Sequence, residues 1–155
     1  MRHASTIVLA GLVSGAVDIL GAFASYTAQG ATVQGILKYI ASGLLGPSAM
    51  QGGVEIAAVG LLCHLLLTTA MAAIYWVAAR KFQVLAAQPW RWGSVYGVLT
   101  WIAMVFVAVP LSGVTGWKLP QGWAIVGGLL AHIFYVGVPI AHIVRHGSCG
   151  SHQPA

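Results

Sequence analysis

A chain of 155 residues with only seven basic and two acidic side chains differs sharply from a soluble domain, in which roughly 25% of residues are charged. Hydrophobic residues make up 59% of the chain and its mean hydropathy is +0.87, so the composition excludes a soluble globular protein and indicates a membrane protein. The net charge of +5 is not concentrated in a basic cluster with interleaved aromatic residues, so nothing suggests nucleic-acid binding.

Four apolar segments are long enough to cross a bilayer, for which a helix needs about 20 residues. They predict an all-α polytopic membrane protein whose four transmembrane helices form two helical hairpins. We expect one transmembrane domain over residues 1–146 and a disordered tail over residues 147–155, since short polar termini are usually disordered. The spans are expected at about residues 6–26, 56–79, 92–111 and 123–144.

The first span contains an aspartate, Asp18, within its apolar run. The aspartate and the length of the run favour a retained span over a cleaved signal peptide. Asp18 shares a stripe of small residues with Gly11, Ser14, Gly15 and Gly21. That stripe must face protein, because an aspartate in hydrocarbon costs roughly 2.5–3.5 kcal/mol even on a lenient scale. We expect it to pack within the bundle, with a homodimer contact as the alternative.

The segment between the first two spans, residues 27–55, contains an amphipathic stretch too short to span. Its apolar residues are spaced as on one helical face and predict a helix at about residues 33–45, which Gly46-Pro47 ends. We expect an interfacial helix lying flat with its apolar face down. The alternative is a re-entrant segment whose glycine-rich run, residues 43–53, lines a cavity.

Two short motifs each occur twice. Gly-Leu-Leu-x-His ends at His64 in the second span and at His132 in the fourth. Gly-x-x-x-Gly with a polar residue three positions later leads to Asp18 in the first span and to Thr100 in the third. The pattern suggests two parallel hairpin repeats related by an axis along the membrane normal. The motif glycines are expected to allow close helix packing; they are Gly11, Gly15, Gly60, Gly93, Gly97 and Gly128.

The repeated histidines and the aspartate are predicted to lie at one depth. At about 1.5 Å per residue, Asp18 and His64 lie about 12 Å, and His132 about 13 Å, below the outer ends of their spans. Ionisable residues at such depth are functional-site candidates. With Thr100 they form a predicted intramembrane polar layer. One interpretation is a structural knot of neutral histidines hydrogen-bonded to Asp18, Thr68 or Thr100; another is a proton or ion relay.

A third interpretation is a cofactor site. His64 and His132 have the spacing to hold a haem b between them, with Gly60 and Gly128 one turn away making room for the macrocycle. A copper or zinc site using the two histidines with Cys63 or Met104 is a weaker variant, since Cys63 points about 100° away from His64. Cys63 and Cys149 imply no disulfide framework.

The basic residues predict an orientation. With both termini in the cytoplasm, five basic residues lie on the inner face and two on the outer face, as the positive-inside rule requires. The excess also attracts anionic lipids, so the lipid bilayer is an expected partner. The inner residues are Arg2, Arg80, Lys81, Arg91 and Arg145, and the outer ones are Lys38 and Lys118.

Three runs of the chain carry a resemblance to known proteins: GAVDILGAF at residues 15–23, ASGLLGPSAMQGG at residues 41–53, and the segment that follows Gly60. Together they resemble a family of small, uncharacterised four-span bacterial inner-membrane proteins, over nearly the whole chain. A more distant similarity is to the second half of YagU-type inner-membrane proteins, and it is carried by Trp92-Gly93, residues 109–113 and residues 128–132. The first half of this chain departs from the YagU type. The resemblance implies a bacterial plasma membrane and four helices, and it brings no activity or functional residues.

These observations favour a small transport-like or accessory membrane protein and do not indicate an enzyme. The chain has neither a nucleotide-binding glycine loop nor a serine in a nucleophile elbow. No resident cofactor is expected in this interpretation. The alternative is a bis-histidine haem b electron-transfer subunit. A homodimer or a larger membrane complex is compatible with either.

Overall fold

The computed structural model describes residues 2–114 and 116–149 of this chain. Within these ranges the regular secondary structure is entirely helical. Four of the helical segments are long and apolar enough to cross a membrane, namely His3–Thr27, Val54–Lys81, Pro89–Leu111 and Trp123–Gly147. The predicted all-α polytopic fold is therefore confirmed.

Two of the long helices are uninterrupted and two are composite. The first is α1 (Arg2–Thr27) and the second is α3 (Val54–Lys81). The third joins α5 (Pro89–Ala103), η2 (Met104–Ala108) and α6 (Val109–Leu111). The fourth joins α7 (Trp123–Ala131), η3 (His132–Gly137) and α8 (Val138–Cys149). Helix α8 thus includes the first three positions of the expected tail, and residues 150–155 lie outside the described residues.

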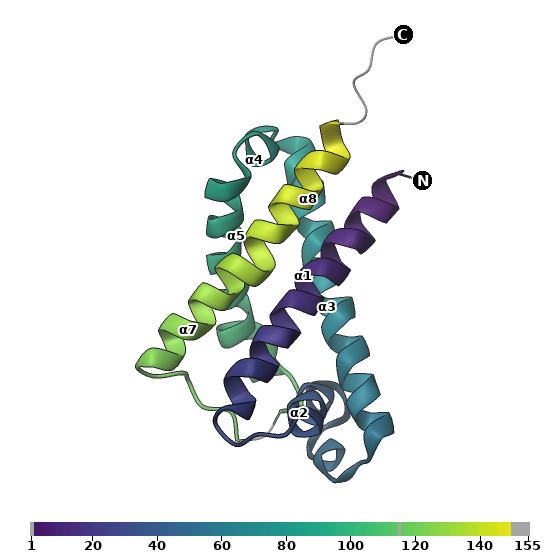
Figure 1. The fold of residues 1–155 in the computed structure, drawn as a ribbon, viewed down its shortest axis with the longest axis vertical. Coiled ribbons are helices and arrows are strands. Elements are labelled where there is room, and N and C mark those ends of the chain that lie inside the picture. The colour runs from purple at the N-terminus through teal and green to yellow at the C-terminus, as the bar shows by residue number, and fades with distance from the viewer. Residues whose placement is uncertain (1, 115, 150–155) are drawn as a thin grey trace.

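The four long helices pack as two antiparallel pairs (Figure 1). Helix α1 pairs with α3, and α5 pairs with η3 and α8 of the fourth helix. The pairs join where α1 packs against η3 and α8 and where α3 meets α8. The described chain begins and ends at the same end of the bundle. This pairing is the arrangement expected for two hairpins.

Glycines of the Gly-x-x-x-Gly motifs lie where the paired helices approach most closely. Gly11 and Gly15 of α1 face Thr69 and Thr68 of α3, and an added Cβ at either glycine would collide with them. Such close approach lets helices associate in lipid, where no hydrophobic driving force acts between them. In the second pair Gly93 faces Val138, and Gly97 faces His132 and Ile133.

Both composite helices contain a π-helical segment, η2 in the third and η3 in the fourth. Each is followed directly by a Val-Pro dipeptide, with Pro110 and Pro139 as the prolines. Because proline has no N–H to donate to the carbonyl four residues earlier, the helix cannot keep regular α-helical hydrogen bonding there. Such segments occur frequently at functional sites. The second of them places His132 at its first residue.

The short helix α2 (Val33–Leu45) lies across the end of the bundle opposite the termini and packs on α3 (Figure 1). Thr32 caps it by accepting a hydrogen bond from the Gly35 amide at 3.0 Å. Gly60 of α3 faces the backbone of Leu37, so this motif glycine lets α2 pack closely against α3. The crosswise position is the one an interfacial helix requires. Two further short helices are η1 (Pro47–Gln51) and α4 (Val84–Ala87).

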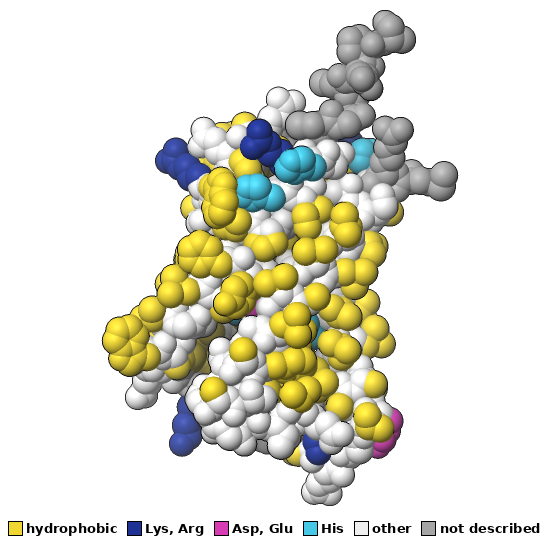
Figure 2. Space-filling model, in the orientation of Figure 1, with side chains coloured by type: hydrophobic (Ala, Val, Ile, Leu, Met, Phe, Trp, Pro, Cys, Tyr) yellow, Lys and Arg dark blue, Asp and Glu magenta, His cyan; other side chains and the backbone are white. Residues whose placement is uncertain are grey.

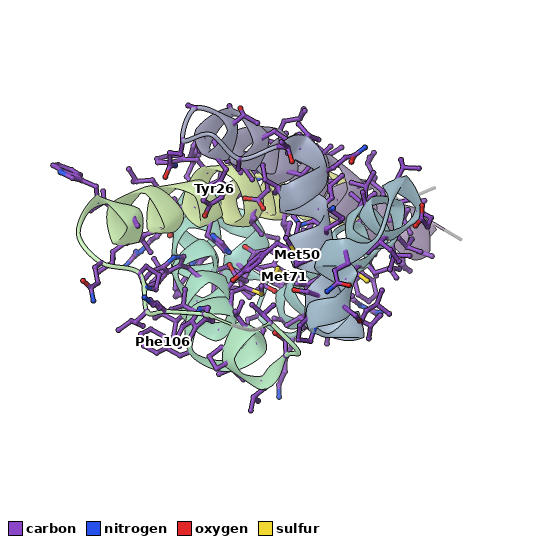
Figure 3. All side chains as sticks on the ribbon, turned by 90° about the horizontal axis from the view of Figure 1, so that it is seen from below. Tyr26, Met50, Met71 and Phe106 are labelled. Carbon is purple, nitrogen blue, oxygen red and sulfur yellow. The ribbon has the colours of Figure 1, made fainter. Side chains whose placement is uncertain are left out.

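The distribution of buried and exposed side chains is the one expected for a helical bundle in lipid. The buried core lies toward the end that carries the termini and includes Ala10, Ala72, Tyr75 and Ile140. Figure 2 shows apolar side chains over the lateral surface and Lys and Arg near the two ends. Seen from the end that carries α2, Met71 lies within the bundle and Phe106 at its periphery, where it is 54% exposed (Figure 3).

Candidate functional site

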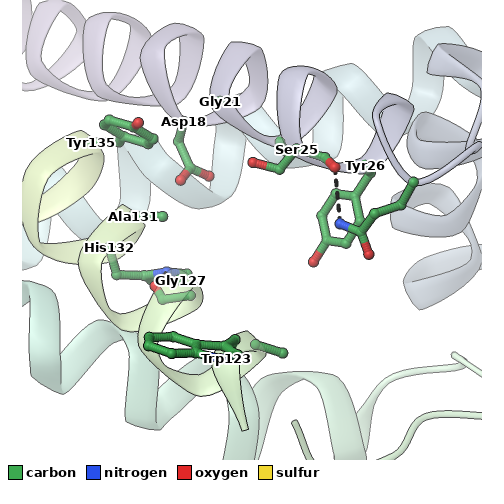
Figure 4. Close-up of a pocket in the computed structure, with 13 residues that line it drawn as sticks. Asp18, Gly21, Ser25, Tyr26, Trp123, Gly127, Ala131, His132 and Tyr135 are labelled. Atoms are coloured by element: carbon green, nitrogen blue, oxygen red, sulfur yellow. Dashed lines mark hydrogen bonds between the residues drawn. The ribbon is translucent and has the colours of Figure 1, made fainter. Parts of the chain in front are cut away.

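A groove of about 550 Å³ lies between α1 and the fourth helix (Figure 4). It forms because α1 packs against η3 and α8 while α7 diverges from it (Figure 1). One end of the groove, its mouth, lies at Tyr26 and Gln29 near the end of the bundle that carries α2, and its inner end lies at Asp18 and His132 toward the middle of the bundle. It is lined by Asp18, Gly21, Ala22, Ser25, Tyr26 and Gln29 on one side, and by Trp123, Ala124, Gly127, Gly128, Ala131, His132 and Tyr135 on the other.

Asp18 projects from α1 into the inner part of this groove (Figure 4). Its side chain is 18% exposed, and its Oδ2 lies 3.8 Å from Nε2 of His64 on α3. This distance is too long for a hydrogen bond and permits an ion pair only when the imidazole is protonated. Within the described part of the chain, no group donates a hydrogen bond to the Asp18 carboxylate.

His64 is held against α1 by a different contact. Its Nε2 lies 3.0 Å from the carbonyl oxygen of Gly15. Because a carbonyl oxygen only accepts, Nε2 carries the hydrogen and donates it. Next to it, the Thr68 hydroxyl donates to the carbonyl oxygen of Gly11 at 3.0 Å. These two bonds fasten α3 to the face of α1 on which Asp18 lies.

His132 approaches the same carboxylate from the fourth helix. Its Nδ1 donates to the carbonyl oxygen of Gly128, one turn earlier, at 3.0 Å. The ring lines the groove with Asp18 (Figure 4). Asp18 and His64 both lie near enough to His132 to interact with it electrostatically. The fold therefore places one acidic and two basic ionisable groups, from three helices, around the inner end of the groove.

Thr100, the fourth residue assigned to the polar layer, has a more local contact. It is buried, and its hydroxyl donates to the carbonyl oxygen of Gly97 on its own helix at 3.0 Å. The threonine that links two helices in this region is Thr68. Its hydroxyl stands one turn after His64 on α3, facing α1.

Sequence reasoning missed Tyr135 as a lining residue. Its ring fills the space beside Gly21 of α1, where an added Cβ would lie 2.5 Å from Cε2. Tyr135 stands three residues after His132 and thus on the same helical face, which is the signal that sequence spacing offered. Tyr26 and Trp123 also line the groove.

The two spaces that the haem interpretation assigns to the macrocycle are occupied by other groups of the chain. The space beside Gly60 holds the backbone of Leu37, and the space beside Gly128 holds the indole of Trp101. Nε2 of His64 is engaged with α1. Among the described residues, no group of three or more His, Cys, Asp or Glu side chains is arranged to hold a metal ion.

Fold and site together define an all-α polytopic membrane protein with a cluster of ionisable side chains on three of its candidate spans. Comparisons of the chain with family models, with curated proteins and with solved structures find no match. Its function must therefore be inferred from the groove and its residues.

Proposed function

We propose that this chain is a small proton-linked transport protein of the bacterial inner membrane, in which Asp18 accepts and releases a proton beside His64 and His132. The observation that carries the proposal is the position of the Asp18 carboxylate. It faces a groove that extends from the middle of the bundle to the end that carries α2, and histidines of two other helices flank it. Chains of Asp and His within membranes serve as relays in pumps and transporters.

The two histidines suit this role because each retains a second ring nitrogen. His64 uses Nε2, and His132 uses Nδ1, to donate to a backbone carbonyl. The opposite nitrogen of each neutral ring is a proton acceptor. Such a ring can therefore take up a proton from a neighbouring carboxylic acid.

Charge supports an orientation in which the groove opens to the outside. Arg80, Lys81 and Arg91 lie near the end that carries the termini, and Lys38 lies on α2 at the other end. From the positive-inside rule we infer that the termini lie in the cytoplasm and the groove mouth at the outer interface. The π-helical segment η3 lies between α7 and α8 and begins at His132, and such segments occur frequently at functional sites.

Reconstitution tests the proposal. The purified protein is placed in vesicles that hold a trapped pH-sensitive dye, with valinomycin and potassium balancing the charge moved. We expect an imposed proton gradient to dissipate faster than in protein-free vesicles, and Asp18→Asn to reduce the rate to the protein-free level. The matched control is Glu55→Gln, which removes the chain's other acidic group at the exposed start of α3 and should leave the rate unchanged. Equal rates for Asp18→Asn and the parent would contradict the proposal.

A further inference from the structure

We propose that the groove between α1 and the fourth helix binds a hydrophobic organic cation, an amine or quaternary ammonium, with Asp18 as its counter-ion. The inference rests on the proposed function, because it assigns a ligand class to the same proton-exchanging carboxylate. Four observations carry it: the charge of the groove, the unused acceptors of Asp18, the aromatic lining and the size of the space.

The charge that acidic and basic side chains bring to the groove is negative, because it comes from the Asp18 carboxylate. The chain has two acidic residues, and Glu55 lies outside the groove, where its Oε1 accepts a hydrogen bond from the Gly53 amide at 2.9 Å. Of the described residues that line the groove, Asp18 is the only acidic one, and none is Lys or Arg. A carboxylate in a site of low dielectric attracts cations strongly and repels anions.

The hydrogen-bonding capacity of Asp18 is left open by its neighbours. The Nε2–H of His64 is donated to Gly15, and the Nδ1–H of His132 is donated to Gly128. Neither hydrogen is directed to the carboxylate. Because a charge at this depth is unfavourable without a partner, Asp18 takes up a proton, pairs with a protonated His64, or pairs with a positively charged ligand.

The walls of the groove fit an organic cation better than a hydrated metal ion. The rings of Tyr26, Trp123 and Tyr135 line it, and the remaining wall is mostly glycine and alanine. Aromatic faces attract organic cations through their quadrupole. Hard metal cations instead need about six oxygen ligands. The volume of about 550 Å³ lies in the range of small-molecule sites.

Proton and cation then compete for one carboxylate. When a cation binds to protonated Asp18, the O–H bond breaks, the proton leaves to water, and the carboxylate pairs with the cation. The ionisable groups facing Asp18 are His64 from α3 and His132 and Tyr135 from the fourth helix; Tyr26 lies nearer the groove mouth, on α1 itself. Protonation of either histidine adds positive charge beside the site and also weakens cation binding.

Two probes of equal shape and opposite charge test the inference on the full-length protein in detergent. Tetraphenylphosphonium should bind in equilibrium dialysis, whereas tetraphenylborate should bind at least tenfold more weakly. Asp18→Asn should weaken phosphonium binding at least tenfold, and Glu55→Gln should leave it unchanged. Trp123→Ala should weaken it several-fold without affecting folding, because Trp123 is 87% exposed. Phosphonium binding should weaken as pH falls and should release protons into weakly buffered solution.

Equal binding of the two probes, or phosphonium binding that survives both Asp18→Asn and Trp123→Ala, would overturn the inference. If protons cross vesicles in an Asp18-dependent way and phosphonium does not bind, the ligand class is wrong and the proton pathway stands. If phosphonium binds through Asp18 and no proton flux occurs, the binding site stands and the transport function is wrong.

Discussion

The imidazole of His64 on α3 donates to the backbone carbonyl of Gly15 on α1, at 3.0 Å. Gly15 has no side chain, and a Cβ added there would lie 2.5 Å from the Thr68 hydroxyl oxygen. The glycine therefore lets α3 approach, and its carbonyl then holds the histidine within 3.8 Å of Asp18. One residue serves both helix packing and the geometry of the ionisable cluster.

The tautomers of the two histidines are the first prediction. At neutral pH His64 should carry its hydrogen on Nε2 and His132 on Nδ1, because those nitrogens donate to Gly15 and Gly128. Long-range ¹H–¹⁵N correlation spectra of histidine-labelled protein distinguish the two forms, with His64→Gln and His132→Gln providing the assignments. The same tautomer at both positions would show that one of these hydrogen bonds is absent.

Glycine packing leads to a stability prediction. Gly97→Ala should destabilise the protein by about 1–3 kcal/mol, the usual cost of overpacking. The new methyl group would lie 2.5 Å from the His132 carbonyl oxygen and 2.5 Å from Cα of Ile133. Gly127→Ala is the matched control, since no atom lies within 4 Å of a Cβ built there. Denaturant titration in detergent micelles measures both variants, and equal loss of stability in the two would refute the packing role of Gly97.

Removal of the His64–Gly15 hydrogen bond between α3 and α1 should destabilise the protein only slightly. His64→Ala removes the hydrogen bond to Gly15, and interhelical bonds in membranes contribute about 0.6 kcal/mol on average. We expect a decrease in stability of about that size in the same titration. Thr27→Ala is a suitable control because its exposed hydroxyl donates to the Phe23 carbonyl within α1. A loss of several kcal/mol specific to His64 would point to a mainly structural role for the cluster.

Topology is predicted by the distribution of charge. In a cysteine-free background, single cysteines at Gln34 and Lys118 should react with a membrane-impermeant thiol reagent in intact cells. A cysteine at Gln88 should react only after the cells are opened. Gln34 and Gln88 are both exposed and lie toward opposite ends of the bundle, so accessibility within the protein does not favour either. The reverse labelling pattern would invert the orientation and place the groove mouth inside the cell.

Absorption spectroscopy separates the transport and haem interpretations. The purified protein should lack a Soret band before and after reduction with dithionite. We expect this because Leu37 and Trp101 occupy the spaces beside Gly60 and Gly128. A Soret band that disappears in both His64→Ala and His132→Ala would establish the haem alternative.

The sequence by itself determined the four long apolar helices, the short helix between the first two, and the motifs through which the long helices pair. In lipid every backbone polar group must be satisfied within its own segment, so apolar runs of sufficient length leave only one choice of secondary structure. The same logic placed Asp18 on a protein-facing stripe, since exposure to hydrocarbon is costly. The glycine motifs predicted close contacts because only small residues permit them.

Only the tertiary structure decided the hydrogen-bond partners of the two histidines, which stand in the same sequence motif. His64 and His132 end the same motif, yet one donates to a neighbouring helix and the other to its own. Likewise, Gly60 packs against the backbone of α2, whereas Gly128 packs against the indole of Trp101. The divergence of α7 from α1, which opens the groove, begins where the helix widens at η3 before Pro139. Such outcomes depend on the relative placement of whole helices, and a motif specifies only the residues that each helix offers at a given depth.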